Sequence, residues 1–395
     1  MSTGVTAPLG FRAAAVASGI KPDRLDLALV VADTGCAAAG VFTANLAKAA
    51  PVLVSREHLA SGRARAIVVN AGCANAATGE AGLADARETA EIVAHTVGCQ
   101  PEEVLVASTG VIGVRLPMEK VRAGIAEAGR RISRHAGADA ARAIMTTDTR
   151  PKEVAVEFRV GDATCLVGGM AKGAGMIAPN MGTMLAYAFT DASLAPADAR
   201  RLLREATDAT FNRIVVDGDT STNDTAALFA NGACGQPPLA GNGLAVFRDA
   251  LLSLLLDLAL MIVRDGEGAT RVVRLSVRGA RTAADATKAA RAAASSPLVK
   301  TAVHGADLNW GRVIAVLGRA GIAVDPMKIS MRFAGETLLR RGMRPDPAAE
   351  RRAVPKIRSE AYAIDVDLGL GKGCDYVYFS DLSVAYVKLN SGYRS

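Results

Sequence analysis

The sequence predicts a layered α/β or α+β protein with a smaller, sheet-rich domain at its C-terminal end. Strand-like and helix-like runs alternate over most of the 395 residues, as they do where helices pack on a sheet. Half of the residues are hydrophobic but only 4% are aromatic, which favours closely packed layers of small side chains. The pattern of apolar and polar residues changes near residue 280, and short strand-like runs follow toward the C-terminal end. We therefore expect residues 1–280 to form a larger layered α/β core and residues 281–395 a smaller α+β domain.

The first third of the chain is predicted to contain three buried strands and two helices. The strands are continuous apolar runs, whereas the helices carry apolar residues at intervals of three and four. In chain order they cover residues 27–31 (strand), 66–70 (strand), 85–97 (helix), 104–107 (strand) and 117–132 (helix). Pro117 supports the start of the last helix, because proline is favoured in a first helical turn.

The middle of the chain continues the alternation, and its C-terminal part changes to short strands. Predicted strands cover residues 153–158 and 164–167 as a hairpin, then 183–191, 214–216 and 272–277. Predicted helices cover residues 196–206, 244–263, 283–294 and 310–318. From residue 329 onward the alternating runs ISMRF, YAIDVDL, DYVYFSD and AYVKLN are all predicted as strands.

The charge pattern indicates an ordinary solvated surface. The net charge is +7, but the basic residues are dispersed along the chain. The densest basic cluster, residues 340–344, is interrupted by Gly342 and Met343, so we do not expect nucleic acid as a partner. The most apolar run, residues 250–263, contains Asp257 and is too short to cross a bilayer, so we expect a buried helix and no membrane association.

Cysteine and histidine usage predicts no metal site. The six cysteines lie far apart without a CxxC pair, and the four histidines lack zinc-ligand spacing. Scattered thiols are typical of a reducing cytosol, and the N-terminal residues lack the apolar core of a signal peptide. We therefore expect a cytoplasmic protein. The cysteines are Cys36, Cys73, Cys99, Cys165, Cys234 and Cys374.

A glycine-rich segment without periodicity, residues 168–182, leads directly into a strand-like run. Residues 173–178 fit the GxGxxA pattern of dinucleotide-binding loops, but Pro179 prevents the required helix from starting. Gly182 and Thr183 suit a different chemistry. Attack of the Thr183 hydroxyl on the preceding peptide bond would expose an N-terminal threonine, whose amino group serves as general base for its own hydroxyl. From spacing alone, a glycine turn entering a strand is the alternative.

Other polar residues lie among small neighbours. Thr109 and Gly110 follow a predicted strand and suit either an oxyanion site or a tight turn. Lys172 in MAKGAG would bind a carboxylate, and Glu267 in RDGEGAT would bind an ammonium group. The acidic run at residues 217–224 lacks the pattern of a calcium loop, and helix capping is the preferred interpretation there.

Ten motifs in one order carry a resemblance to a known family. They are GVTAPLGFRAAAVASGIK near the start, VNAGCANAATG at 69–79, VASTGVIG at 106–113, IMTTDTRPKEV at 144–154, GGMAKGAGMIAPNMGTML at 168–185, VDGDTSTNDT at 216–225, DGEGATR at 265–271, SPLVKTAVHG at 296–305, NWGR at 309–312 and the final YVKLNSGYRS. With them the chain resembles the glutamate N-acetyltransferase (ornithine acetyltransferase) family along essentially its whole length. Single motifs are moderately specific, whereas the ordered set is very specific.

The resemblance implies roles for individual residues. It implies cleavage between Gly182 and Thr183, after which Thr183 is the nucleophile at the start of a β chain. It also implies that Thr109 and Gly110 form the oxyanion hole. The implied substrate-binding residues are Thr146 or Thr147 of the MTTDT motif, Lys172, Thr183, Glu267, Asn390 and Ser395.

The resemblance further implies an acyltransferase of arginine biosynthesis that moves an acetyl group from N2-acetyl-L-ornithine to L-glutamate by a ping-pong mechanism. No cofactor is implied, although some members of the family accept acetyl-CoA as acetyl donor. The implied fold is an αββα-type core similar to N-terminal-nucleophile-like self-processing aminopeptidases, with a C-terminal tail that returns to the active site. The implied assembly is two α and two β chains. A self-processing threonine aminopeptidase or amidase of the same architecture is the alternative.

Overall fold

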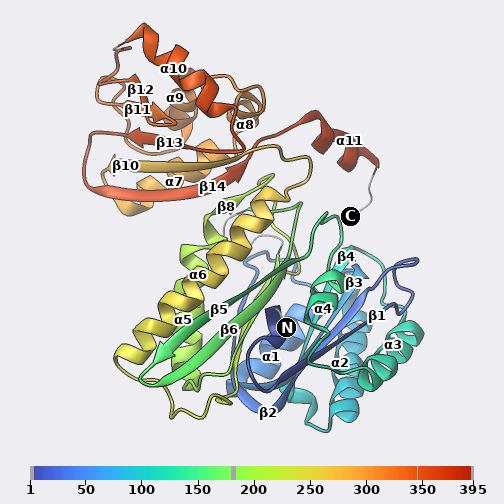
Figure 1. Cartoon of the computed structure of the whole chain (residues 1–395). Coiled ribbons are helices and arrows are strands. Elements are labelled where there is room, and N and C mark those ends of the chain that lie inside the picture. Colours follow the sequence, from blue (N-terminus) through green and yellow to red (C-terminus); the bar gives the residue numbers. More distant parts are fainter. Residues whose placement is uncertain (1–3, 179–183, 345, 393–395) are drawn as a thin grey trace.

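One eight-stranded sheet builds the larger body of the molecule (Figure 1). The computed structural model describes residues 4–178, 184–344 and 346–392. The strand order is β4-β3-β2-β9-β7-β6-β5, and β1 pairs with β2 outside this path. The bounds are β1 (Phe11–Val16), β2 (Leu27–Phe42), β3 (Arg63–Cys73), β4 (Val104–Val111), β5 (Lys152–Val160), β6 (Ala163–Lys172), β7 (Leu185–Thr190) and β9 (Thr225–Ala230).

The long strand β2 folds this sheet into two layers. Residues 27–37 of β2 pair with β3, whereas residues 37–42 pair with β9, and the β2–β3 register shifts between Val31 and Cys36. Strands β1–β4 therefore face β5–β7 and β9 across a shared core to which both layers contribute apolar side chains. Phe11 of β1 contacts Phe189 of β7 across this core, with 5.1 Å between the ring centroids.

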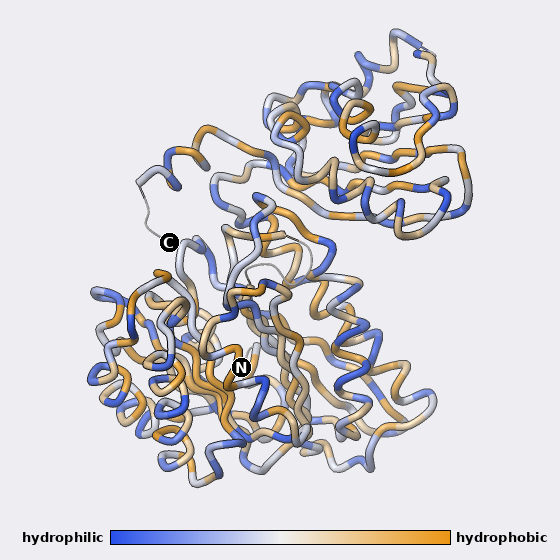
Figure 2. The backbone as a smooth tube through the Cα atoms, turned by 180° about the vertical axis from the view of Figure 1, so that it is seen from behind, coloured by the Kyte–Doolittle hydropathy of each residue, from blue (hydrophilic) through white to orange (hydrophobic). Residues whose placement is uncertain are grey.

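Helices cover both outer faces of the folded sheet. On one face α1 (Ala50–His58), α2 (Gly79–Val97) and α3 (Met118–Arg130) pack against β1–β4. On the other face α5 (Pro196–Ala209) and α6 (Asn242–Arg264) pack against β5–β7 and β9. The layer order is αββα, with the most hydrophobic chain at the centre (Figures 1 and 2). The predicted fold class is thus confirmed.

Short elements complete the larger body. Helix α4 (Gly137–Ala143) contributes to the core between the two layers. Among the described residues, 3₁₀ turns lie before β1 and between longer elements, at Gly4–Thr6, Leu59–Ser61, Pro101–Glu103 and Phe211–Arg213.

A six-stranded sheet builds the smaller body, in the order β12-β11-β13-β10-β14-β8. Its strands are β8 (Ile214–Val215), β10 (Val272–Ala280), β11 (Ser330–Phe333), β12 (Glu336–Leu339), β13 (Ala361–Asp367) and β14 (Gly373–Ser380). Its helices are α7 (Ala283–Ala294), α8 (Pro297–His304), α9 (Trp310–Arg319) and α10 (Pro347–Ile357). The domain division at residue 280 stays a prediction, and the membership of β10 in this sheet favours a boundary before Val272.

Two local predictions were wrong. The run AYVKLN, predicted as a strand, lies in helix α11 (Val384–Gly392). Its neighbour β14 already pairs with β10 on one side and β8 on the other, so a further strand would find no partner there, while a helix satisfies its own backbone. The acidic run at residues 217–224 caps no helix, because it forms the loop between β8 and β9.

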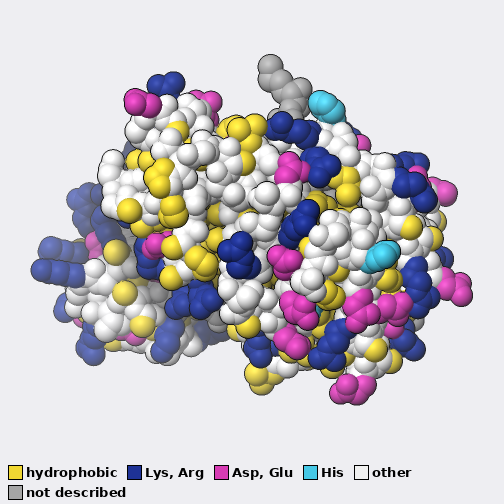
Figure 3. Space-filling model, turned by 90° about the horizontal axis from the view of Figure 1, so that it is seen from below, with side chains coloured by type: hydrophobic (Ala, Val, Ile, Leu, Met, Phe, Trp, Pro, Cys, Tyr) yellow, Lys and Arg dark blue, Asp and Glu magenta, His cyan; other side chains and the backbone are white. Residues whose placement is uncertain are grey.

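The apolar run at residues 250–263 and the charged side chains of the surface can be located in the structure. Within the described ranges, no helix combines the length and apolarity needed to cross a membrane. The apolar run 250–263 forms the C-terminal part of α6, whose buried side includes Leu251, Leu254, Leu258 and Ile262. On the face seen in Figure 3, lysine and arginine side chains lie among aspartate and glutamate side chains.

Candidate active site

A buried lysine links the two layers at one end of the core. Lys172 is the last residue of β6 and is only 4% exposed. Its Nζ donates hydrogen bonds to the hydroxyl oxygens of Thr109, at 3.2 Å, and of Thr146, at 2.8 Å. Burial lowers the pKa of Lys172, and the nearby Asp148 carboxylate opposes that shift. An ammonium group has three protons, and the described residues accept two of them, so the third is available to an anionic ligand as far as these residues show.

The predicted oxyanion residues lie at the end of β4, beside this lysine. Gly110 has φ +132°, and a Cβ built on it would lie 2.3 Å from the carbonyl carbon of Gly72, so only glycine fits. Thr109 accepts a hydrogen bond from Lys172, which leaves its own hydroxyl proton available. The hydroxyl can therefore donate to a developing oxyanion while the ammonium group polarises it.

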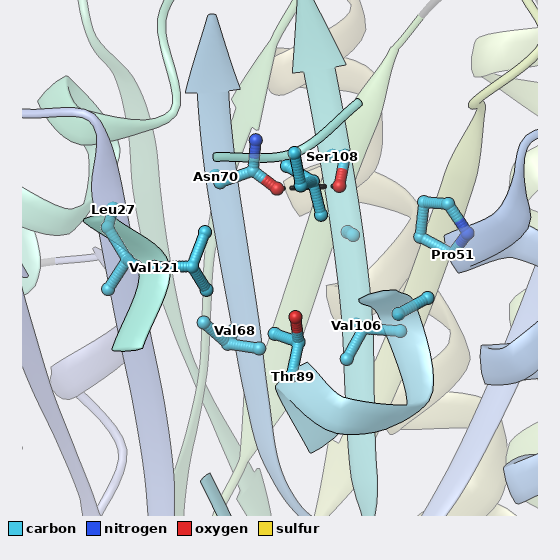
Figure 4. A pocket seen from close by; sticks show the side chains of 11 residues that line it. Leu27, Pro51, Val68, Asn70, Thr89, Val106, Ser108 and Val121 are labelled. Carbon is cyan, nitrogen blue, oxygen red and sulfur yellow. Dashed lines mark hydrogen bonds between the residues drawn. The ribbon is translucent and has the colours of Figure 1, made fainter. Parts of the chain in front are cut away.

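Asn70 and Ser108 hold the ends of β3 and β4 together directly behind Thr109. The Ser108 hydroxyl donates to Asn70 Oδ1 at 2.6 Å, and the Asn70 amide donates to the Cys73 carbonyl at 2.9 Å. Both side chains line a small buried hollow between this edge of the sheet and α2 (Figure 4). Ser108, the residue before Thr109 in β4, is thus fixed to the neighbouring strand β3.

Two adjacent residues at the start of β9 join the remaining parts of the site. Asn223 donates from one amide nitrogen to the carbonyls of Ala74, at 2.6 Å, and Ser108, at 2.8 Å. Asp224 Oδ1 accepts the backbone N–H of Met184 at 2.8 Å. Asp224 Oδ2 has no hydrogen-bond partner among the described residues, and burial raises the pKa of this carboxyl group. The residue before Thr109 and the residue after Thr183 are therefore held by two adjacent side chains.

The MTTDT segment meets Lys172 through its first threonine. Thr146 contacts Lys172, whereas the structure shows no such bond from Thr147, which is half-buried. Asp148 fixes this turn by accepting the backbone N–H groups of Thr146, at 3.0 Å, and Gly173, at 2.7 Å. Of the two predicted threonines, Thr146 is the one brought to the site.

A second buried lysine ties this turn to the loop that carries Glu267. Lys152 Nζ lies 2.6 Å from both Asp148 Oδ1 and Asp265 Oδ2, and its side chain is 2% exposed. Thr149 adds a backbone hydrogen bond to Asp265 at 3.0 Å. Burial alone would raise the pKa of Asp148, but Lys172 and Lys152 outweigh it and lower this pKa to about 2. Asp148 therefore stays ionised between two lysines.

Glu267 lies beside the glycine-rich segment and contacts the C-terminal helix. Its backbone N–H donates to the Ala174 carbonyl at 2.8 Å, and a Cβ on Gly175 would lie 2.6 Å from its carboxylate. Asn390 of α11 donates to Glu267 Oε2 at 2.7 Å. Two predicted substrate-binding residues from distant parts of the chain thus meet directly, and Glu267 also favours the charged form of Lys172.

Gly182, Thr183 and Ser395 lie outside the described residues. A cavity of about 340 Å³ opens beside Thr146 and Asp148 and carries three cationic side chains, Lys21, Arg24 and Arg142. The structure thus joins Thr109 and Thr146 through Lys172, with Gly110 next to Thr109, and it joins Glu267 to Asn390. The charge of Glu267 also acts on Lys172.

The sequence analysis missed the residues that position this network. Asp148, Lys152, Asn223 and Asp224 were not predicted as site residues, although all lie within quoted motifs. Their sequence context could have indicated a site, because each is a charged or amide residue within a motif of small residues and does not belong to a solvent-exposed helix face. Each is less than 9% exposed in the structure.

One end of the αββα core carries a buried ammonium group, two hydroxyl groups that contact it, and a carboxylate whose charge acts on it. These features define an enzyme that acts on a small charged substrate. Comparison with known proteins narrows this class. Residues 12–395 match the model of the ArgJ family. The chain therefore belongs to the ArgJ family, which confirms the resemblance drawn from the motifs and the expected class of enzyme, an acyltransferase.

Relatives are similar over nearly the whole chain. The chain is 47% identical to the arginine biosynthesis bifunctional protein ArgJ of Symbiobacterium thermophilum, over 100% of this chain and 99% of that protein. It is 49% identical to the protein of the same name from Geobacter sulfurreducens, over 98% of this chain and 99% of that one. A solved structure of the Bacillus halodurans protein is 37% identical with a TM-score of 0.51, covering 53% of this chain and 100% of that chain.

The buried ion pairs predict that Lys152 is needed for stability. The Lys152→Met substitution would leave Asp148 and Asp265 as buried carboxylates without their cation. We expect it to lower the free energy of unfolding by about 3–5 kcal/mol, the usual consequence of breaking a buried pair. Denaturant unfolding measures this, with the exposed Lys288→Met as control. Equal stability of the two variants would contradict the structural role of Lys152.

Proposed function

We propose that the chain transfers the acetyl group of N2-acetyl-L-ornithine to L-glutamate, giving L-ornithine and N-acetyl-L-glutamate, through an acetyl ester on Thr183. The contact of Lys172 with Thr109 carries this proposal, because it sets a cation and an oxyanion donor side by side. Family membership over residues 12–395 supports the same reaction.

The nucleophile arises by self-cleavage between Gly182 and Thr183. The Thr183 hydroxyl attacks the Gly182 carbonyl, the peptide rearranges to an ester, and water hydrolyses that ester. This leaves a carboxylate on Gly182 and a free amino group on Thr183. The Bacillus halodurans chain supports cleavage, because its full length covers 53% of this chain. That share is close to the 213 of 395 residues that follow Gly182.

Acetyl transfer then proceeds in two half-reactions. The Thr183 amino group takes the hydroxyl proton as the oxygen attacks the acetamide carbonyl of acetylornithine. Thr109 donates to the resulting oxyanion, and the amine of ornithine leaves with a proton. Glutamate then attacks the acetyl-threonine ester with its α-amino group, which restores the Thr183 hydroxyl and releases N-acetylglutamate. Each half-reaction passes through the same oxyanion site.

The charges at the site suit both amino acids. Lys172 provides a buried ammonium group for a substrate carboxylate, and Glu267, held by Asn390, provides a carboxylate for a substrate ammonium group. Ornithine and glutamate are α-amino acids of similar length, so one pocket serves both in turn. We further propose that two α and two β chains assemble in the cytoplasm, and that acetyl-CoA is a second acetyl donor.

The first functional prediction concerns processing. We expect the expressed chain to split into fragments of 182 and 213 residues, and Thr183→Ala to abolish both splitting and turnover. One hydroxyl serves both reactions, so both fail together. Intact-mass analysis of the purified proteins measures this. A full-length wild-type chain with acetyltransferase activity would refute the mechanism.

The second concerns the oxyanion donor. Thr109→Ala is expected to reduce kcat roughly 100- to 1,000-fold, the usual effect of losing one such donor. The rate of acetylglutamate formation by fully cleaved enzyme is the measurement. Thr147→Ala is the matched control, because Thr147 lacks the contact with Lys172 that Thr146 makes. Normal turnover by the Thr109→Ala variant would show that Thr109 is only a turn residue and no oxyanion donor.

The third concerns substrate charge. Lys172→Met and Glu267→Gln are each expected to raise KM roughly 10- to 100-fold, since a charge-assisted hydrogen bond at a desolvated site contributes about 1.5–3 kcal/mol. Steady-state kinetics with each substrate, after processing has been verified, provides the measurement. The exposed Lys120→Met serves as control. A cleaved variant with unchanged KM and kcat would remove that residue from the site.

A further inference from the structure

Two cysteines that are far apart in the sequence meet at the end of the core remote from Lys172. Cys165 Sγ donates to Cys234 Sγ at 2.8 Å, across a sequence separation of 69 residues. Cys165 is the third residue of β6, whereas Lys172 is its last, so about 20 Å of extended strand separates the thiols from the candidate active site. The network around Lys172 does not involve this pair.

Asp191 holds the backbone of both cysteine segments. Its backbone carbonyl accepts the N–H of Cys234 at 2.9 Å, and its Oδ1 accepts the N–H of Leu166 at 2.8 Å. Oδ2 accepts the N–H of Leu9 at 3.0 Å, so the residue is fixed on a third side. A single residue therefore sets the positions from which both sulfur atoms extend, and the two thiols are brought together by the fold.

We propose that Cys165 and Cys234 form a reversible disulfide bond. A disulfide bond is about 2.05 Å long, so the two sulfur atoms need to approach by less than about 1 Å. Cys165 is fully buried and Cys234 is partly exposed, which sets the order of events. Burial raises the pKa of Cys165 to about 12, so it does not start the exchange as a thiolate.

The disulfide forms by exchange with a low-molecular-weight disulfide such as oxidised glutathione, in two steps. The Cys234 sulfur attacks the glutathione disulfide, forms a mixed disulfide and releases one glutathione thiol. The Cys165 sulfur then attacks the Cys234 sulfur, and the thiol proton of Cys165 leaves with the second glutathione. The protein loses two hydrogen atoms, and one glutathione disulfide becomes two thiols.

The position of the pair gives the bond a function that rests on the proposed self-cleavage. Cys165 precedes Gly182 and Cys234 follows Thr183, so the disulfide joins the two fragments covalently. Before cleavage the same bond closes a loop within one chain. The processed enzyme would then be held together by a bond that responds to the thiol–disulfide balance of its surroundings.

A metal ion fits this cluster less well. The two sulfur atoms and an Asp191 carboxylate oxygen lie within 4.8 Å of one another, and these are three ligands among the described residues. A closed structural zinc site takes four. Both Asp191 oxygens already accept backbone N–H groups, which orients this carboxylate toward the backbone.

The test equilibrates the purified wild-type protein with oxidised glutathione, then denatures it and alkylates free thiols. We expect four alkylated cysteines of the six and a Cys165–Cys234 linked peptide in the digest. On a non-reducing gel the two fragments should run together, and reduction should separate them. Cys234→Ser should abolish the link, whereas Cys99→Ser, also a partly exposed cysteine, should retain it.

Three outcomes would overturn the proposal. They are six alkylated cysteines in the wild type, a stable glutathione adduct on Cys234, or thiol protection that a chelator removes together with a bound metal. The linked peptide is read from the digest whether or not the chain has split, while splitting is read from the reducing gel. Failure of the disulfide and failure of self-cleavage are therefore separate results.

Discussion

The candidate site depends on the hydrogen bonds of two adjacent side chains, Asn223, which donates, and Asp224, which accepts. One holds the carbonyl of Ser108, next to Thr109, and the other holds the N–H of Met184, next to Thr183. Both residues directly precede β9, the strand that joins the second layer to β2. The pairing of β9 with β2 therefore also sets the positions of Ser108 and Met184, the neighbours of Thr109 and Thr183 in the sequence. Removing these amide and carboxylate groups would leave buried backbone groups unpaired, which costs more than the bonds themselves contribute.

The charges beside this link are arranged for function at some cost in stability. Lys172 is buried enough to lower its pKa, and the hydroxyl groups it contacts are neutral, so its burial is poorly compensated. Lys152, by contrast, lies between two carboxylates and resembles a structural ion pair. Asp148 pairs with Lys152, and its charge also opposes the lowering of the Lys172 pKa by burial. Such a division, with one lysine satisfied and one left for a ligand, is what a binding site for an anionic group requires.

The sequence predicted the elements whose pattern is local and missed those that depend on distant partners. Apolar patterns predicted α6 and the strands of the αββα core other than β1 and β9. The ordered motifs pointed to Thr109, Lys172, Glu267 and Asn390 as candidate site residues. Periodicity cannot show that β2 continues to Phe42 and changes partner from β3 to β9, because that requires the fold. It also cannot show that β8, only two residues long, joins the distant β14. Cys165 and Cys234 look scattered in the sequence for the same reason.

The last helix of the smaller body, α11, contributes Asn390 to the candidate site. The carboxylate of Asp381 fixes the start of the segment that leads into this helix. Asp381 follows β14 and accepts the backbone N–H groups of Thr270 and Arg271 at 2.7 and 2.8 Å, as well as a bond from His304. Because Thr270 lies three residues after Glu267, the carboxylate ties the entrance of α11 to the loop that carries Glu267. Helix α11 buries none of its own residues, so its packing alone would not fix its direction. Asn390 reaches Glu267 because both ends of the connection are anchored to the same loop, which brings the smaller body to the candidate site.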